Sequence, residues 1–246
     1  MLEFIKEHQI ANYECDRNSK LRIKSIFNLL QDSLDQFSTA RGIGHDFCRE
    51  NNLTYVIRNY DVQVYALPGM SENITIHSFL SAAKNSSMYF RQELKNAVSR
   101  QTLIMAATQT VLLDLRHMRP VRLNDRLPAG SLCDQLNQPI VFEHLGTLER
   151  IHHTKMQDVL WDHIDFNQHI NNANYIAFAQ SALSPAFLDC ALPRRIQVSY
   201  LQPTTLGDTV RIDTDLKNTG ATDHQILSTQ KGKLLARVRI NWARSR

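Results

Sequence analysis

Hydrophobic residues in the first 45 positions recur with the spacing of a helix. Between residues 19 and 42 they return at intervals of three and four, which places them on one face of an amphipathic helix. Ser19 precedes the pattern and Gly42 supplies a stop, because glycine readily adopts the conformation that ends helices. The apolar face consists of Ile23, Ile26, Phe27, Leu30, Leu34 and Phe37. We expect one helix of about six turns.

After this helix the pattern changes to a period of two, as in half-buried antiparallel strands. The predicted strands lie around residues 56–64, 74–76 and 88–94. Residues 103–115 are apolar nearly throughout, as in a strand buried on both faces. The extreme N-terminus reads as a further strand.

The second half of the chain repeats this plan. A strand near residues 155–160 precedes a helix that starts at about Asn172 and is limited or kinked at Ser184-Pro185. Further strands follow at residues 196–200, 210–214 and 234–240. The helix is apolar almost all round, so a curled antiparallel sheet must enclose it. A short segment also recurs in both halves, and we expect Tyr65-Ala66-Leu67-Pro68-Gly69 in the first to correspond to Tyr200-Leu201-Gln202-Pro203 in the second.

A segment without periodicity separates the halves. Residues 116–139 contain three prolines and several charges, which is typical of a linker. We predict an N-terminal domain at 1–128, a linker at 129–144 and a C-terminal domain at 145–246.

Composition excludes several classes of protein. With 43% hydrophobic and 21% charged residues, the 246-residue chain is neither disordered nor collagen-like. No apolar stretch is long enough to span a membrane, and no signal peptide is evident. The four cysteines lack C-x-x-C spacing, which favours a reducing cytoplasm over a disulfide framework. The net charge of +4 is mild, and the basic residues lack the interleaved aromatics of a nucleic-acid surface.

One stretch concentrates potential chemistry. Residues 162–175 contain two Asp, two His and four Asn, directly ahead of the second apolar helix. Asp165, Asn167 and His169 therefore lie just upstream of a helix N-terminus, whose dipole and free N–H groups favour a developing oxyanion. Asp165 can act as base or nucleophile, His169 can orient water and carry a proton, and Asn167 can hold water or a carbonyl oxygen.

The motif Asp165-x-Asn167-x-His169-Ile170-Asn171-Asn172-x-x-Tyr175 resembles the catalytic loop of the acyl-ACP thioesterases, the plant plastid enzymes and their bacterial relatives. The resemblance covers most of the chain. Further matching segments are Gln31-Asp32, Val111-Leu112-Leu113-Asp114, Arg119-Pro120-Val121-Arg122, Tyr200 and Gly207-Asp208.

The resemblance implies an α+β tandem double hotdog, in which two antiparallel sheets each wrap around a central helix. It also implies hydrolysis of fatty acyl-ACP to free fatty acid and ACP, with acyl carrier protein as the partner and no metal or organic cofactor. Catalysis is expected from Asp165, Asn167 and His169. Asn172, Tyr175 and Gln202 are the expected substrate-binding residues.

One position departs from the family pattern. The family has a glutamate three residues after the tyrosine that matches Tyr200, whereas this chain has Pro203. The missing carboxylate leaves a non-hydrolytic acyl-binding hotdog protein as an alternative, beside an acyl-CoA thioesterase on the same fold.

Other interpretations stay open at this point. The Asp165 motif could be a polar turn that caps a buried helix, or Asp162, His163, Asp165 and His169 could hold a metal. The basic group Arg116, Arg119, Arg122 and Arg126 is either a solvated linker or a docking site for an acidic carrier. Exposed sheet edges would allow a homodimer.

Overall fold

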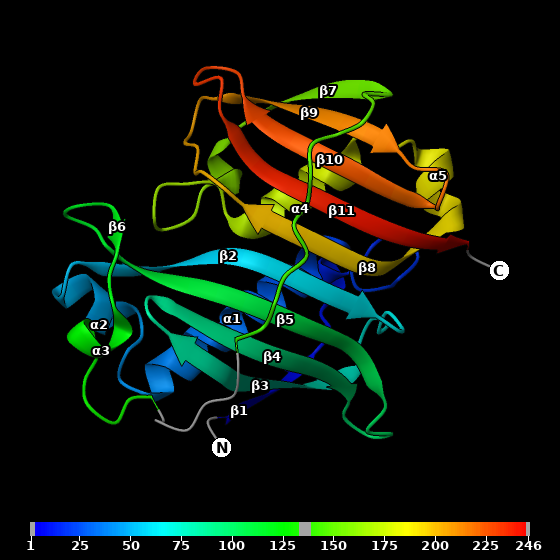
Figure 1. Ribbon diagram of the computed structural model, residues 1–246. Coiled ribbons are helices and arrows are strands. Elements are labelled where there is room, and N and C mark those ends of the chain that lie inside the picture. Colours follow the sequence, from blue (N-terminus) through cyan, green and yellow to red (C-terminus); the bar gives the residue numbers. More distant parts are fainter. Residues whose placement is uncertain (1–2, 133–138, 245–246) are drawn as a thin grey trace. The chain divides into compact units, whose positions relative to one another are not determined.

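The computed structural model describes residues 3–132 and 139–244. The chain forms two compact units, residues 1–142 and 143–246. In each unit an antiparallel sheet packs one of its faces against a helix (Figure 1). The limits predicted for the two domains and their linker stay a prediction.

The first unit has its strands in the order β1-β3-β4-β5-β2, with the short β6 paired to β5. All neighbours in this sheet are antiparallel. Its elements are β1 (Glu3–Gln9), the 3-10 turn η1 (Asn12–Glu14), α1 (Ile23–Ala40), α2 (His45–Glu50), β2 (Leu53–Val64), β3 (Asn73–Lys84), β4 (Ser87–Asn96), β5 (Thr102–Asp114), β6 (Arg119–Pro120) and α3 (Leu123–Arg126).

Helix α1 lies behind the first sheet in Figure 1 and buries the predicted apolar face. All six residues of that face are at most 5% exposed. The helix begins at Ile23 rather than beside Ser19, which instead belongs to a preceding turn with φ +57°. Gly42 has φ +68°, as expected after a helix end.

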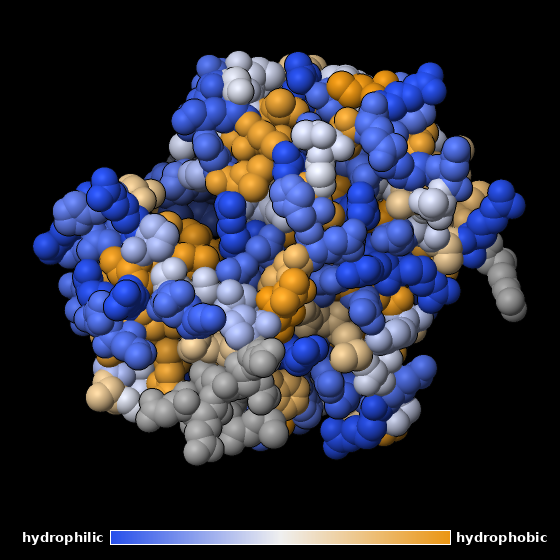
Figure 2. Space-filling view, viewed as in Figure 1, coloured by the Kyte–Doolittle hydropathy of each residue, from blue (hydrophilic) through white to orange (hydrophobic). Residues whose placement is uncertain are grey.

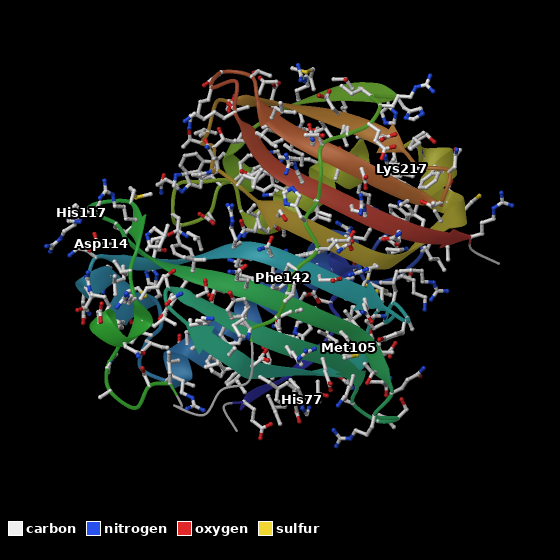
Figure 3. All side chains as sticks on the ribbon, in the orientation of Figure 1. His77, Met105, Asp114, His117, Phe142 and Lys217 are labelled. Atoms are coloured by element: carbon white, nitrogen blue, oxygen red, sulfur yellow. The ribbon has the colours of Figure 1, made fainter. Side chains whose placement is uncertain are left out.

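The proline-containing segment is folded for about half its length. Asp114, at the end of β5, accepts hydrogen bonds from the amides of Arg116 and His117, and its other oxygen accepts one from Arg126 (Figure 3). The Arg126 guanidinium is the main cause that lowers the pKa of Asp114 to about 2. Leu123 and Leu127 then join the hydrophobic core. Residues 116–127, which composition alone marks as linker-like, therefore have ordered structure that precedes the predicted linker at 129–144.

The second unit has the strand order β8-β11-β10-β9-β7, again antiparallel throughout. Its elements are β7 (His153–Asp158), η2 (Trp161–His163), α4 (Asn172–Ser181), α5 (Pro185–Cys190), β8 (Ala191–Tyr200), β9 (Thr209–Leu216), β10 (Ala221–Ser228) and β11 (Leu234–Arg244). Helix α4 packs on β9, β10 and β11.

Besides the short elements β6, α3, η1 and η2, the sequence pattern failed to predict three longer ones. Strand β10 was missed because polar residues occupy its buried face, where His224 is hydrogen-bonded between Thr214 and Thr222. The short α2 was taken for loop. Ser184-Pro185 does not merely limit α4: Ser184 caps a second helix, α5, by accepting the N–H of Phe187 at 3.2 Å.

The sheets follow the alternation expected of a one-sided core. In β5 and β11, buried residues alternate with partly exposed ones along most of the strand. The face shown in Figure 2 is accordingly mostly hydrophilic, with hydrophobic residues in separate patches. Among the described residues, no helix has the length and hydropathy needed to cross a bilayer.

Candidate active site

Residues 164–170 form a tight turn that leads into α4. Ile164 and Ile170 pair as an isolated antiparallel bridge, and the amide of Asp165 donates to the carbonyl of His169 at 2.9 Å. The Asp165 carboxylate accepts the amide of Asn167 at 2.8 Å, and Gln168 adopts φ +61°. The turn therefore brings Asp165 and His169 side by side at its base, with Asn167 near its exposed tip.

The two titratable side chains of this turn interact electrostatically. Burial lowers the pKa of His169, the Asp165 carboxylate opposes that effect, and the Lys231 ammonium adds to the lowering. His169 is consequently neutral at pH 7 and able to accept a proton. Asp165 is partly buried and supplies the adjacent carboxylate.

Asn171 is the N-cap predicted from the Asn pair. Its side-chain oxygen accepts the amide of Ala173 at 2.9 Å, and its carbonyl accepts the amide of Asn174, also at 2.9 Å. Of the amides of residues 172–174, only that of Asn172 has no partner within the described residues. Of these three amides, that of Asn172 is the one left to donate a hydrogen bond to a bound group.

The predicted substrate-binding residues lie in different environments. Asn172 is partly buried, and its carbonyl accepts the Tyr200 hydroxyl at 3.0 Å. Tyr175 is 3% exposed and packs edge-on against Tyr200 at 5.7 Å between ring centroids. Burial raises the pKa of Tyr175, so its hydroxyl stays protonated. Gln202 is exposed, and its backbone amide donates to the carbonyl of Leu235.

The loop 201–208 carries the position where the family has its glutamate. Pro203 is exposed, whereas the next residue, Thr204, is fully buried. The Thr204 carbonyl accepts the amide of Ile170 at 3.1 Å, and its hydroxyl donates to Asp208 at 2.5 Å. Thr204 and Asp208 therefore hold this loop against the Asp165 turn without a carboxylate at position 203.

Asp208 is a buried carboxylate at the junction of three loops, and sequence reasoning gave it no role beyond a family match. One of its oxygens accepts the hydroxyls of Thr204 and Ser228, and the other accepts the amide of Gln230 at 3.3 Å. Burial raises the pKa of Asp208, but these hydrogen bonds outweigh burial and the net pKa is lowered. The β10–β11 turn is thereby tied to the site.

The His163 side chain contacts the protein's own backbone and an aromatic ring. Its Nδ1 accepts the amide of Leu160 at 3.0 Å, and its ring packs edge-on against Phe178 at 4.9 Å. Throughout residues 3–132 and 139–244, no group of three or more His, Cys, Asp or Glu residues is arranged to hold a metal ion. The metal alternative therefore finds no support in the described part of the chain.

A pocket of about 580 Å³ opens elsewhere in this unit, at the end of β9 opposite Asp208. Its wall includes Lys217, labelled in Figure 3, which is paired with Asp215 at 2.8 Å and Glu149 at 2.9 Å. None of the predicted site residues lines this pocket.

The same turn occurs in the first unit. Asp16 accepts the amides of Asn18 and Lys20 through its carboxylate, and its own amide donates to the Lys20 carbonyl at 2.8 Å. Cys15 and Leu21 form the bridge, and Ser19 has the positive φ. Asp16, Asn18 and Lys20 thus correspond to Asp165, Asn167 and His169.

The correspondence expected for the tyrosine segments is wrong by one residue. The backbone amides of Tyr65 and Ala66 both donate to the carbonyl of Leu103 on β5. In the second unit the amides of Leu201 and Gln202 both donate to the carbonyl of Leu235 on β11. Tyr65 therefore corresponds to Leu201, and the residue that corresponds to the buried Tyr200 is Val64.

Comparison with known proteins decides the family. The N-terminal domain model of the acyl-ACP thioesterases matches residues 1–130, and the C-terminal domain model matches residues 147–244. The chain belongs to the acyl-ACP thioesterase family. The resemblance drawn from the Asp165 motif is thus confirmed.

Similar proteins include plant and bacterial members of this family. A chloroplastic acyl-(acyl-carrier-protein) hydrolase of Cuphea viscosissima is 18% identical over 98% of this chain, which spans 63% of that relative's length. The 12:0-ACP thioesterase of Umbellularia californica superposes with a TM-score of 0.86 at 17% identity, covering 100% of this chain and 98% of the other. An acyl-ACP thioesterase of Bacteroides thetaiotaomicron gives 0.82 at 15% identity, covering 98% of each chain. These likenesses confirm the predicted α+β double hotdog.

Proposed function

We propose that this protein hydrolyses fatty acyl-ACP thioesters to free fatty acid and ACP. The observation that carries the proposal is the turn that pairs the backbones of Asp165 and His169 and keeps their side chains within electrostatic range, at the start of a buried helix, in a chain of the acyl-ACP thioesterase family.

The chemistry assigns one role to each group. Asp165 takes a proton from water as the new C–O bond forms at the thioester carbon. The amide of Asn172 and the side chain of Asn167 donate hydrogen bonds to the carbonyl oxygen, which becomes negative. The C–S bond then breaks as the proton taken up by Asp165 passes to neutral His169, which gives a proton to the departing thiolate, so that acid and thiol leave and both side chains return to their starting state. Direct attack by Asp165, with water hydrolysing the resulting anhydride, uses the same residues.

The substrate-binding assignments fit this scheme. Tyr175 and Tyr200 form an aromatic pair beneath the helix start, which would support the carbonyl end of an acyl chain. Asn172 and the exposed Gln202 would contact the thioester and the amides of the pantetheine arm. The partner is acyl carrier protein, whose acidity suits the exposed Arg116, Arg119 and Arg122, while Arg126 is paired with Asp114.

The cellular setting belongs to the same proposal. Cys15, Cys48 and Cys190 are free thiols, which suits the reducing cytoplasm expected from the sequence. Fractionation of cells that produce the protein checks this placement, and light scattering of the purified protein checks the homodimer.

The test is an end-point assay of fatty acid released from a panel of acyl-ACPs, with matched acyl-CoAs in parallel. Acyl-ACP hydrolysis at a higher kcat/KM than acyl-CoA supports the proposal. Preference for acyl-CoA replaces it with the acyl-CoA thioesterase. Retention of acyl-ACP without product, unchanged in Asp165→Asn, replaces it with the non-hydrolytic binder that Pro203 suggests.

A further inference from the structure

The β10–β11 turn, residues 228–233, stands beside the proposed site and has no part in the hydrolytic scheme. Its backbone is held at both ends. Thr229 donates its amide and hydroxyl to the carbonyl of Thr209, and Gln230 donates its side-chain amide to the carbonyl of Gly207 at 2.7 Å. Ser228 closes the turn by donating its amide to the carbonyl of Lys233 at 2.9 Å.

Lys231 is at the tip of this turn, where its own amide donates to the Ser228 hydroxyl oxygen at 3.0 Å. That hydroxyl in turn donates to Asp208, which is hydrogen-bonded to Thr204. Since the Thr204 carbonyl accepts the Ile170 amide, a continuous chain of hydrogen bonds joins Lys231 to the catalytic turn. The lysine backbone is held there by hydrogen bonds, and its side chain is exposed.

The charge of Lys231 is not neutralised locally. Within the described part of the chain no carboxylate forms an ion pair with it. Asp208, the acid closest along the hydrogen-bond chain, is already satisfied by two hydroxyls and an amide. The ammonium is nevertheless close enough to His169 to lower the pKa of that imidazole.

An exposed cation at the edge of the site, without an ion-pair partner among the described residues, suits an anion carried by the substrate. The arm that delivers the acyl chain of ACP or CoA ends in a phosphate, which the whole length of the pantetheine separates from the thioester. We propose that Lys231 binds the phosphate of the phosphopantetheine arm while the thioester lies between Asp165 and His169. The interaction is a charge-assisted hydrogen bond made before and during reaction, so it acts on KM rather than on kcat. This inference rests on the proposed function.

The test compares two substrates that differ by the phosphate alone, acyl-4′-phosphopantetheine and acyl-pantetheine, at pH 8, where His169 is neutral with or without the lysine. In Lys231→Gln the KM for the phosphorylated substrate rises about tenfold. The KM for acyl-pantetheine and both kcat values stay unchanged. Lys231→Arg retains most of the phosphate preference, as does Lys233→Gln, the matched control on the same turn.

A KM change of equal size on both substrates, or on neither, would overturn the assignment. Raised salt gives a second readout, because it should weaken binding of the phosphorylated substrate in the wild type and not in Lys231→Gln. The KM of Lys231→Gln is then measured with matched acyl-ACP and acyl-CoA. The carrier whose KM rises in the variant is the one whose phosphate Lys231 binds. A wild-type protein that hydrolyses no thioester refutes the proposed function itself, an outcome distinct from hydrolysis without phosphate discrimination.

Discussion

The Asp16 turn and the Asp165 turn have the same backbone but different chemistry. In both turns the aspartate carboxylate accepts the backbone amide of the residue two positions later. The aspartate's own amide donates to the backbone carbonyl four positions later. The first turn ends in Lys20 and the second in His169. The comparison shows that the aspartate and the positive φ build the turn, while the residue at its end decides whether a proton can be transferred near neutral pH.

The helix that follows differs as well. Asn171 caps α4 with its side chain, whereas the corresponding Arg22 has no side-chain cap and instead donates its guanidinium to the carbonyl of Cys15. The polar-turn alternative is therefore a full account of the Asp16 turn. It is an incomplete account of the Asp165 turn, where the carboxylate acts electrostatically on a neutral imidazole.

Exchange of the two end residues gives the largest expected effect. His169→Lys retains the turn, as Lys20 does in the first unit, but should lower kcat by about 10²–10⁴ because proton transfer is lost. Lys20→His should leave kcat unchanged. Steady-state hydrolysis of acyl-ACP measures both, with melting temperatures as the folding control. An equal loss in both variants would remove the distinction between the turns.

Truncation of the asparagines is expected to have the next largest effect. Asn167→Ala should lower kcat about 10²-fold if its amide donates to the oxyanion. Asn18→Ala, at the matching position, should have no kinetic effect. In both turns the asparagine backbone, rather than its side chain, makes the bond to the aspartate, so neither change should alter stability. A folded Asn167→Ala enzyme with full activity would exclude this role.

The acids that anchor the two site loops also differ. Asp208 is 2% exposed, whereas the corresponding Glu72 is partly exposed and binds the amide of Gly69 and the side chain of Asn96. Asp208→Asn should therefore lower the free energy of unfolding by about 2 kcal/mol, and Glu72→Gln by less. Urea denaturation measures the two values. A larger loss in Glu72→Gln would contradict the ranking.

The sheets differ in pH response at corresponding positions of β4 and β10. Gln92 donates to Ser78 in the first unit, while His224 bonds to Thr214 in the second. Burial lowers the pKa of His224 to about 3. The unfolded chain then binds more protons between pH 6.5 and 3, so His224 destabilises the fold as pH falls, by at most about 1.4 kcal/mol per unit. His224→Gln should flatten this slope in denaturation curves, and an unchanged slope would refute the account.

Restoring the family's glutamate should have the smallest effect. Pro203 is exposed and the loop is already held by Thr204 and Asp208. Pro203→Glu should therefore change kcat/KM by less than about twofold, well below the effect of a positioned acid or base. A large gain in rate would show that the missing carboxylate limits this protein.

The sequence predicted the elements whose apolar residues are periodic and failed where polar residues are buried. Helix α1 and strand β5 follow their patterns closely. Strand β10 was missed because His224 and Thr222 break the apolar alternation on its buried face. Short helices such as α5 carry too few residues for a period to appear.

The site was predicted only as far as it is local. Residues 165–175 are contiguous in the sequence, so their motif predicts both the turn and the start of the helix. Asp208 and Lys231 reach the site through hydrogen bonds across three loops, a tertiary arrangement that no spacing in the sequence encodes. The catalytic and substrate-binding assignments stay predictions until variants are measured.

Of the two matching turns, we propose that only the second performs hydrolysis. The most direct test of this central claim is single-turnover release of fatty acid from acyl-ACP by Asp165→Asn and by Asp16→Asn, since asparagine keeps an oxygen for the turn amide while removing the charge. We predict a loss of about 10² or more for Asp165→Asn and none for Asp16→Asn. Full activity in Asp165→Asn would contradict the account.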